Sequence, residues 1–289
     1  MGDFGILFCR PGPGSTMEDD FALEADVVDA LDFETHVIDA DFVVDGEPEH
    51  AVARLPLDAG ALLYRGPILS AEEYEALSDA LAERGATLVT EPSAYEHALY
   101  VPEHHEDIAD LSAPTRWTYG EDIDEAWEAA KELGDGPWLL KDHVKSAKEH
   151  WLEACFVAAG ATRGEFGEVA EALLGYRGER FERGFVIRGF LELAASSVRT
   201  QERRIPDEHR LFFWEGELIA HAPYHPIGAP LTNTAPFHIL GGRIDSPFFT
   251  ADVAFLLDGG WVVVEINDGG VSALPEDLHP RHLYERIRG

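Results

Sequence analysis

The chain has 289 residues, 45% of them hydrophobic, and a formal net charge of −33. That length predicts about two domains. The excess of acidic residues repels nucleic-acid backbones and anionic membranes, so we expect neither as a partner. Apolar runs such as Trp261–Ile266 are too short to span a membrane, and Met1–Cys9 lacks the pattern of a signal peptide. With Cys9 and Cys155 expected as buried thiols, these features predict a cytoplasmic globular protein.

The N-terminal part of the chain alternates between strand-like and helix-like patterns. Apolar residues at helical spacing cover Asp19–Leu31. Ser70 and Glu73 form a capping box for a helix that ends near Arg84. The expected strands are Phe4–Cys9, Glu34–Ile38, Ala61–Tyr64 and Thr87–Thr90. Because strands that alternate with helices form parallel sheets, this part predicts an α/β layer.

The stretch Ser112–Thr118 contains a proline and is expected to be the boundary to a second domain. Beyond it, helical patterns cover Asp122–Leu133 and Ser146–Ala159. The expected strands are Trp138–Lys141, Phe185–Arg188, Leu211–Trp214, Glu217–Ala220, Ala251–Leu257 and Trp261–Ile266. Tight turns at Glu215-Gly216 and Asp258–Gly260 predict that this part is largely antiparallel.

The hairpin near the C-terminus brings oxygen-bearing side chains together. Asp252 begins one strand, and Glu265 and Asn267 lie near the end of the next. Because residues 265 and 267 are two positions apart, they face the same side of the sheet, and the turn places Asp252 beside them. Solvated acids on a surface hairpin would not explain why these groups follow an apolar strand. The sequence therefore predicts a Mg²⁺ site with nucleotide phosphates as further ligands.

Lysine is scarce in this chain, and its positions are uneven. Three of the four lysines, Lys141, Lys145 and Lys148, fall within eight residues. If surface lysines have been replaced throughout, these three are expected to have a chemical role. A solvated helix face remains the alternative.

Other residues downstream are candidates for contacts with anions. Glu208 and Arg210 share one face of a strand, where Arg210 could neutralise the charge of a transferring phosphate. A surface ion pair fits that pattern equally well. Gly269 and Gly270 would let backbone amides approach an anion, and Ser272 could donate a hydrogen bond to it.

Arg10 and Arg65 each follow a strand of the N-terminal sheet, at the edge where open α/β sheets bind ligands. We expect them at a substrate carboxylate, although arginines satisfied within the protein fit the pattern as well. The run Glu103–Glu106 contains two histidines. It is expected to be a solvated loop, because neighbouring residues seldom point at one metal ion.

Lys141, Arg210 and the hairpin from Asp252 to Asn267 resemble the ATP-grasp superfamily of carboxylate–amine ligases. The thirteen-residue step from Asp252 to Glu265 is similar to that of D-alanine–D-alanine ligases and ribosomal-protein glutamate ligases. More closely, the chain resembles a small ATP-grasp family of bacteria and phages, nearly from end to end. The segments that carry this resemblance are Tyr64–Gly66, Glu91–Tyr95, Pro114–Trp117, Lys141–Lys148, Glu208–Arg210 and Asp252–Gly269.

The resemblance implies an α/β fold with α+β character in its C-terminal lobes. An N-terminal pre-ATP-grasp α/β domain would cover residues 1–112, and a two-lobed ATP-grasp domain residues 113–289. Its small lobe would span about 113–187 and its large lobe about 188–289. ATP would lie between the two lobes.

The resemblance also assigns residues to the nucleotide. Lys141 would contact the α- and β-phosphates, and Lys145 and Lys148 would lie on a mobile loop over them. The hinge strand, including Ile187 and Arg188, would hold adenine through its backbone.

Two further residues are expected at the nucleotide on the same grounds: Glu192 at the ribose and Arg116 at the phosphates.

The implied reaction is an ATP-dependent ligation. A carboxylate would attack the γ-phosphate of Mg²⁺-bound ATP, and an amine would displace phosphate from the acyl phosphate, with Arg210 and Lys141 as catalytic residues. The substrates would be a small-molecule or peptide carboxylate and an amine, and the protein could form a homo-oligomer. Two alternatives remain: phosphoryl transfer without ligation, and nucleotide sensing without turnover.

Overall fold

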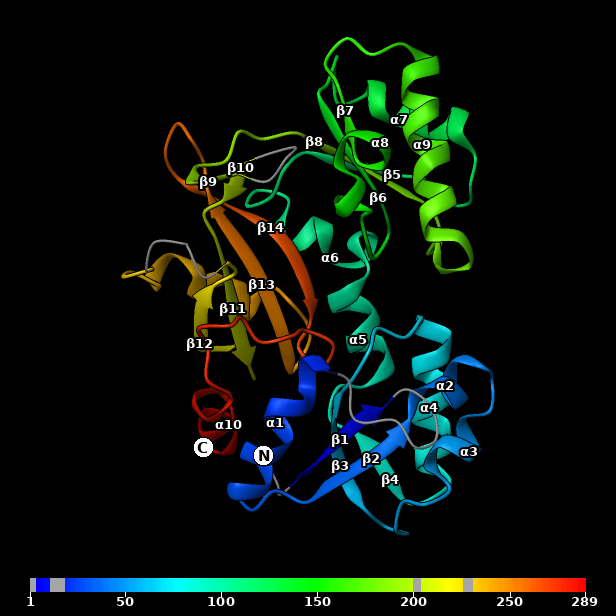
Figure 1. Ribbon diagram of the computed structural model, residues 1–289, viewed down its shortest axis with the longest axis vertical. Helices are drawn as coiled ribbons and strands as arrows, with labels where there is room; N and C mark the ends of the chain where they lie inside the picture. The colour runs from blue at the N-terminus through cyan, green and yellow to red at the C-terminus, as the bar shows by residue number, and fades with distance from the viewer. Residues whose placement is uncertain (1–3, 11–18, 200–203, 226–230) are drawn as a thin grey trace.

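The computed structural model describes residues 4–10, 19–199, 204–225 and 231–289. Its N-terminal part is a parallel sheet with strand order β2-β1-β3-β4 (Figure 1). The strands are β1 (Phe4–Arg10), β2 (Thr35–Asp39), β3 (Gly60–Arg65) and β4 (Ala86–Leu88). The helices are α1 (Asp19–Ala30), α2 (Ala40–Val44), α3 (Pro48–Val52), α4 (Ala71–Ala82), α5 (Pro92–Leu99) and α6 (Val101–Ile108). The expected α/β layer and the capping box at Ser70 are confirmed.

The middle of the chain forms a lobe around an antiparallel sheet with order β5-β8-β6-β7. Its strands are β5 (Thr115–Trp117), β6 (Trp138–Asp142), β7 (Phe156–Val157) and β8 (Phe185–Gly189). Its helices are α7 (Ile123–Lys131), α8 (Trp151–Ala154) and α9 (Arg163–Arg177), with the short 3₁₀ turns η1 (Lys148–His150) and η2 (Gly178–Arg180). The helix expected over Ser146–Ala159 is thus much shorter, because the chain enters β7 directly after Cys155.

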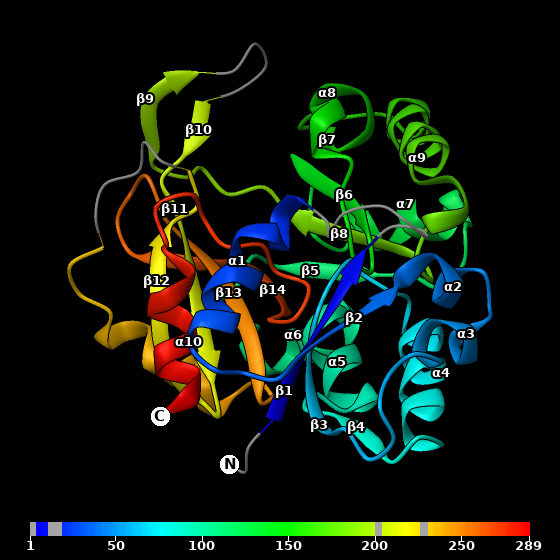
Figure 2. The same ribbon diagram turned by 60° about the horizontal axis from the view of Figure 1, so that its bottom comes forward.

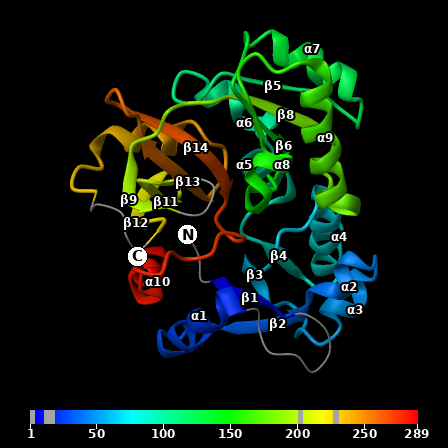
Figure 3. The ribbon, with the colours of Figure 1, turned by 45° about the horizontal axis from the view of Figure 1, so that its top comes forward.

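The C-terminal part is an antiparallel sheet with order β12-β11-β13-β14, and Figure 3 separates it from the middle lobe. Its strands are β11 (Glu208–Trp214), β12 (Glu217–Pro223), β13 (Phe248–Phe255) and β14 (Trp261–Asp268). A small hairpin of β9 (Ala195–Arg199) and β10 (Arg204–Pro206) precedes it, η3 (Ala235–Gly242) lies within it, and α10 (Pro280–Arg288) ends the chain. The described helices include none that is both long and apolar enough to cross a membrane.

Alternation along β11 divides the two faces of this sheet. Leu211 and Phe213 pack in a cluster with Ala98 and Ile108 of α5 and α6. Phe212 and Trp214 face the other way and share a cluster with residues of β1, β3 and α10. Figure 2 shows α10 beside α1, where the C-terminus meets the N-terminal layer. One face of the sheet therefore joins the two ends of the chain into one core.

The run Glu103–Glu106 is not the solvated loop that we expected. It lies in α6, where Pro102 occupies the first turn, a position that suits the fixed backbone of proline. His104 and His105 are buried, and Nδ1 of His104 lies 2.9 Å from the carbonyl oxygen of His97. Burial lowers the pKa of His104 to about 3, so this side chain is neutral.

Arg65 joins the N-terminal layer to the loop after β14. The side chains of Arg65 and Glu24 are fully buried, with N···O distances of 3.0 and 2.5 Å between them. Arg65 Nη1 also donates to the carbonyl oxygens of Gly269 at 2.5 Å and Ser272 at 3.1 Å. The Tyr284 hydroxyl of α10 donates to Glu24 at 2.5 Å. One buried guanidinium thus ties α1, β3 and the C-terminal part together.

We predict that Arg65→Met lowers the free energy of unfolding by about 3–5 kcal/mol, because it leaves the Glu24 carboxylate buried without its partner. Arg281→Met is the control, since Arg281 pairs with Glu285 at the surface and should contribute less than about 1 kcal/mol. Urea unfolding of both variants measures the difference. Equal effects of the two substitutions would show that the buried pair does not hold these parts together.

Candidate functional site

A row of functional side chains crosses the C-terminal sheet on one face. Arg210 of β11 is the direct partner of Asp252 in β13. Asp252 is in turn the partner of Glu265 in β14, next to a register shift in that strand. Direct partners in a sheet have side chains on the same face, and Asn267 lies two residues further along. Strand register therefore brings the three predicted metal ligands and Arg210 together.

Arg210 and Asp252 form a buried two-pronged ion pair. Nε of Arg210 lies 2.8 Å from Oδ1 of Asp252, and Nη2 lies 2.7 Å from Oδ2. Arg210 Nη1 also donates to the carbonyl oxygen of Ala273 at 3.0 Å. Because a guanidinium fork matches a carboxylate in shape, this pairing fixes both side chains.

Glu265 is surrounded by lysines. Nζ of Lys141, on β6 of the middle lobe, lies 3.2 Å from Oε1 of Glu265. Burial by itself would raise the pKa of Glu265, but the charges of Lys141, Lys145 and Lys148 lower that pKa below its usual range. Burial lowers the pKa of Lys145. Three of the chain's four lysines thus act on one carboxylate.

The donor set fits a magnesium ion. Oδ1 of Asn267 is buried and has no hydrogen-bond partner in the described parts of the chain, so it is an acceptor without a donor. Each carboxylate oxygen of Asp252 and Glu265 keeps a lone pair beside its ion pair. Among the described residues, no group of three histidine, cysteine or acidic side chains is arranged for a metal. Two carboxylates and one amide are an oxygen-only set, which suits Mg²⁺.

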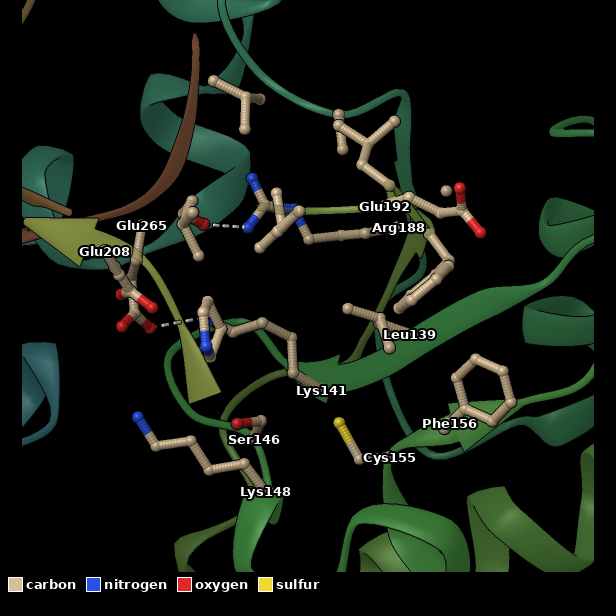
Figure 4. A pocket seen from close by; sticks show the side chains of 18 of the residues that line it. Leu139, Lys141, Ser146, Lys148, Cys155, Phe156, Arg188, Glu192, Glu208 and Glu265 are labelled. Atoms are coloured by element: carbon tan, nitrogen blue, oxygen red, sulfur yellow. Dashed lines mark hydrogen bonds and ion pairs between the residues drawn. The ribbon is translucent and has the colours of Figure 1, made fainter. Parts of the chain in front are cut away.

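A cavity of about 780 Å³ opens beside this row, between the middle lobe and the C-terminal sheet. Figure 4 shows Glu208 and Glu265 side by side in it, with Lys141 reaching toward them and Glu192 at a distance. The charged residues that line it are Lys141, Lys148, Arg188, Glu192, Glu208 and Glu265. The apolar residues include Leu139, Trp151, Leu152, Phe156, Phe190 and Leu191. The cavity therefore combines a charged part with a large apolar surface.

The segment after β8 lines this cavity, and β8 itself does so less than expected. Ile187 is fully buried, and its backbone is paired on both sides, with Arg116 of β5 and Leu140 of β6. Ile187 therefore has no free backbone group for a base, which corrects the expected contact. The segment from Gly189 to Ala194 lines the cavity instead. Glu192 lies there and is exposed, as its predicted contact with a ribose requires.

Arg188 connects the middle lobe to the C-terminal sheet. Its Nη1 donates to the carbonyl oxygen of Val264, and its Nη2 donates to the Ser112 hydroxyl at 2.6 Å. Burial lowers the pKa of Arg188, and the charge of Glu265 opposes that shift. Its guanidinium thus lies at the cavity wall, with two of its donors used by the protein.

Some predicted residues lie elsewhere. Arg116 pairs with Glu132 at 2.8 Å on the surface and is not among the residues that line the cavity, so the structure does not bring it to this site. Lys145 is near Glu265 but does not line the cavity either. Arg10 ends β1, and its buried Nε has no hydrogen-bond partner among the described residues. Its role at a substrate stays a prediction, since residues 11–18 lie outside the described ones.

The loop after β14 is held from behind by Arg65, so Arg65 has a structural role and not the expected role at a substrate. A Cβ on Gly269 would meet the ring of Phe248 at 2.5 Å, and one on Gly270 would meet the Tyr64 carbonyl oxygen at 2.6 Å. Close packing therefore requires both glycines.

Ser272 is used within the same loop. Its buried hydroxyl lies 2.8 Å from the hydroxyl of Thr250 and donates to the carbonyl oxygen of Asp268. Direct contacts of Gly269, Gly270 and Ser272 with a substrate stay predictions.

Sequence reasoning missed part of the cavity wall. Cys155 was expected as a buried thiol, and it is buried and free, but it also lines the cavity. Phe190 and Leu191 had no recognisable pattern. Glu208 had a signal, because it lies two residues before Arg210 and so shares its face.

Burial and the nearby charge of Asp252 raise the pKa of Glu208 to about 8, against the opposing charges of Lys148 and Arg210. Because an unfolded glutamate titrates near pH 4.3, ionising Glu208 costs folding energy as the pH rises from about 4.3 toward 8. We predict that Glu208→Gln, in EDTA, gains stability over the wild type by at least about 1 kcal/mol between pH 5 and pH 8.

Urea unfolding at both pH values measures this gain. The exposed Glu128→Gln serves as the control and should show no such trend. A gain for Glu208→Gln that stays constant with pH would contradict the raised pKa.

Comparisons with known proteins agree with this geometry. No curated protein sequence matches the chain. A RimK-domain ATP-grasp protein from Sphaerobacter thermophilus has a TM-score of 0.63 at 17% identity, covering 98% of this chain and 97% of that one. D-cycloserine synthetase DcsG has a TM-score of 0.60 at 15% identity, covering 98% and 100%. The ATP-grasp ligase PsnB, solved with a minimal precursor variant, Mg and ADP, has a TM-score of 0.54 at 12% identity, covering 97% and 93%.

At these identities the solved structures establish the fold, which is that of ATP-grasp enzymes. A family model described as an ATP-grasp domain, the third family of its clade, matches residues 132–287. That match spans more than half of the 289 residues. The chain therefore belongs to this third family of its clade of ATP-grasp domains.

Proposed function

We propose that this protein is an ATP-dependent ligase that joins a carboxylate to an amine through an acyl phosphate, with release of ADP and phosphate. The observation that carries the proposal is the meeting of opposite charges at one cavity. Lys141 and Lys148 line it from the middle lobe, and Glu265 lines it from the sheet, beside Asp252 and Asn267. A phosphoryl transfer between anions needs cations on both reacting groups, and this arrangement can supply them.

The shape of the cavity supports a nucleotide that lies along it. We place the base against the apolar wall of Phe190 and Leu191 and the ribose at Glu192. The triphosphate would then extend toward Lys141 and Lys148. A volume of about 780 Å³ is within the range of small-molecule sites.

Asp252, Glu265 and Asn267 would hold Mg²⁺ at the phosphate end. When bound, the ion would neutralise charge on the phosphates and fix their orientation. Arg210 is placed by Asp252 at two points, so its guanidinium stays beside the site throughout. We assign Arg210 to the oxyanion that forms when the amine attacks the acyl phosphate.

The substrates would be a peptide or small-molecule carboxylate and an amine. Support for this class comes from the related fold of PsnB, which was solved with a precursor, and from D-cycloserine synthetase. Arg10, at the end of β1 with a buried and unpartnered Nε among the described residues, is our candidate for the substrate carboxylate.

We predict that Glu265→Gln lowers ADP formation from Mg–ATP at least about 100-fold, because the substitution removes one charge at the phosphates. The assay screens carboxylates and amines for ADP release, with hydroxylamine added to trap an acyl phosphate as a hydroxamate. Glu128→Gln, on the surface of α7, is the matched control and should leave the rate unchanged.

The outcomes separate the possible functions. A ligase releases ADP and free phosphate when both substrates are present and yields a hydroxamate with hydroxylamine. Release of ADP without free phosphate would replace the proposal by phosphoryl transfer. Mg–ATP binding without turnover on any substrate pair would indicate a sensor, and full activity of Glu265→Gln would refute the assigned metal site.

A further inference from the structure

Tyr224 directly follows β12 and stands beside the functional row. Ala222, two residues earlier, is the direct partner of Arg210 in β11, so Tyr224 faces the same side of the sheet. Its backbone N–H donates to the carbonyl oxygen of Glu208 at 2.7 Å. The main chain therefore fixes the position of the ring relative to Arg210 and Glu208.

The ring of Tyr224 has two cations over it. The guanidinium carbon of Arg210 lies 4.7 Å from the ring centroid, and Nζ of Lys148 lies 5.3 Å from it. Both distances are in the range of cation–π attraction. Two like charges repel each other, and the negative face of one aromatic ring offsets part of that repulsion.

The two cations depend on the ring to different degrees. Arg210 is already held by both oxygens of Asp252 and by the Ala273 carbonyl oxygen. Lys148 begins the short turn η1, is exposed, and belongs to a segment of the middle lobe. Its contact with Tyr224 bridges the middle lobe and the C-terminal sheet across the cavity. Loss of the ring should therefore release Lys148 more than Arg210.

We propose that Tyr224 is a positioning residue of the nucleotide site: its ring holds Lys148 close to Arg210, so that this lysine is in place before the phosphates bind. The inference rests on the proposed function, because it assigns Lys148 to the phosphates. A side chain that is ordered in advance loses less entropy on binding, so the ring increases the affinity for the nucleotide without touching it.

The test compares Tyr224→Leu with Tyr224→Phe, alone and combined with Lys148→Met. Calorimetry measures the affinity for the β,γ-imido analogue of ATP in the presence of Mg²⁺. We expect Tyr224→Leu to bind roughly 3- to 10-fold more weakly than the wild type, and Tyr224→Phe to stay within about twofold of it, because phenylalanine keeps the ring. In the Lys148→Met background, Tyr224→Leu should change the affinity by less than about twofold.

Lys131→Met is the matched control for Lys148→Met. Lys131 also lies over an aromatic ring, Trp127 at 5.8 Å, but it pairs with Glu128 on the surface of α7, away from the cavity. Its loss should leave the affinity unchanged. Thermal unfolding shows whether each variant folds, and Tyr224→Met replaces the leucine variant if that one does not.

Several results would overturn the inference. They are an unchanged affinity in Tyr224→Leu, an equal loss with and without Lys148, and a loss in Tyr224→Phe as large as in Tyr224→Leu. Failure of the proposed function has a different signature, in which the wild type and Lys131→Met both fail to bind the nucleotide analogue.

Discussion

The register of the four-stranded C-terminal sheet is the constraint on which the site depends. Arg210, Asp252 and Glu265 come from separate strands, yet direct pairing places them on one face. A slip of one residue would turn a whole strand over and move its charged group into the apolar cluster on the other side. That cluster, which includes Phe213 and Phe249, therefore fixes the chemistry as well as the fold. Apolar packing on one face specifies the charge arrangement on the other.

The buried Arg65 extends this constraint to the N-terminal layer. Its bonds to the carbonyl oxygens of Gly269, Gly270 and Ser272 hold the loop that follows the last predicted metal ligand. The loop has little freedom of its own, since Gly270 packs against the backbone of Tyr64. The N-terminal layer thus acts as the floor beneath the end of β14. Tight packing between parts that are far apart in sequence is therefore a condition for the geometry of the site.

The sequence predicted what depends on local pattern. Asp252 and Glu265 were placed together because strand alternation and one tight turn are short-range features, and the pairing confirms this. Arg65 was misassigned because its partners, Glu24 and the loop after β14, lie 41 and more than 200 positions away. Ile187 was misassigned because no local pattern tells a central strand from an edge strand. The fold followed from periodicity and resemblance, whereas satisfaction of individual side chains required the tertiary structure.

The irregularity in β14 has a mechanical meaning. The register shifts between Asp252 and Val253, and Val264 falls in that shift, directly before Glu265. Its carbonyl oxygen accepts a hydrogen bond from Arg188 of the middle lobe. Any rotation of that lobe away from the sheet must break this bond or pull on the backbone next to Glu265. The bulge therefore works as a joint that transmits lobe position to a carboxylate, and the closed state can be sensed within the same strand that performs the chemistry.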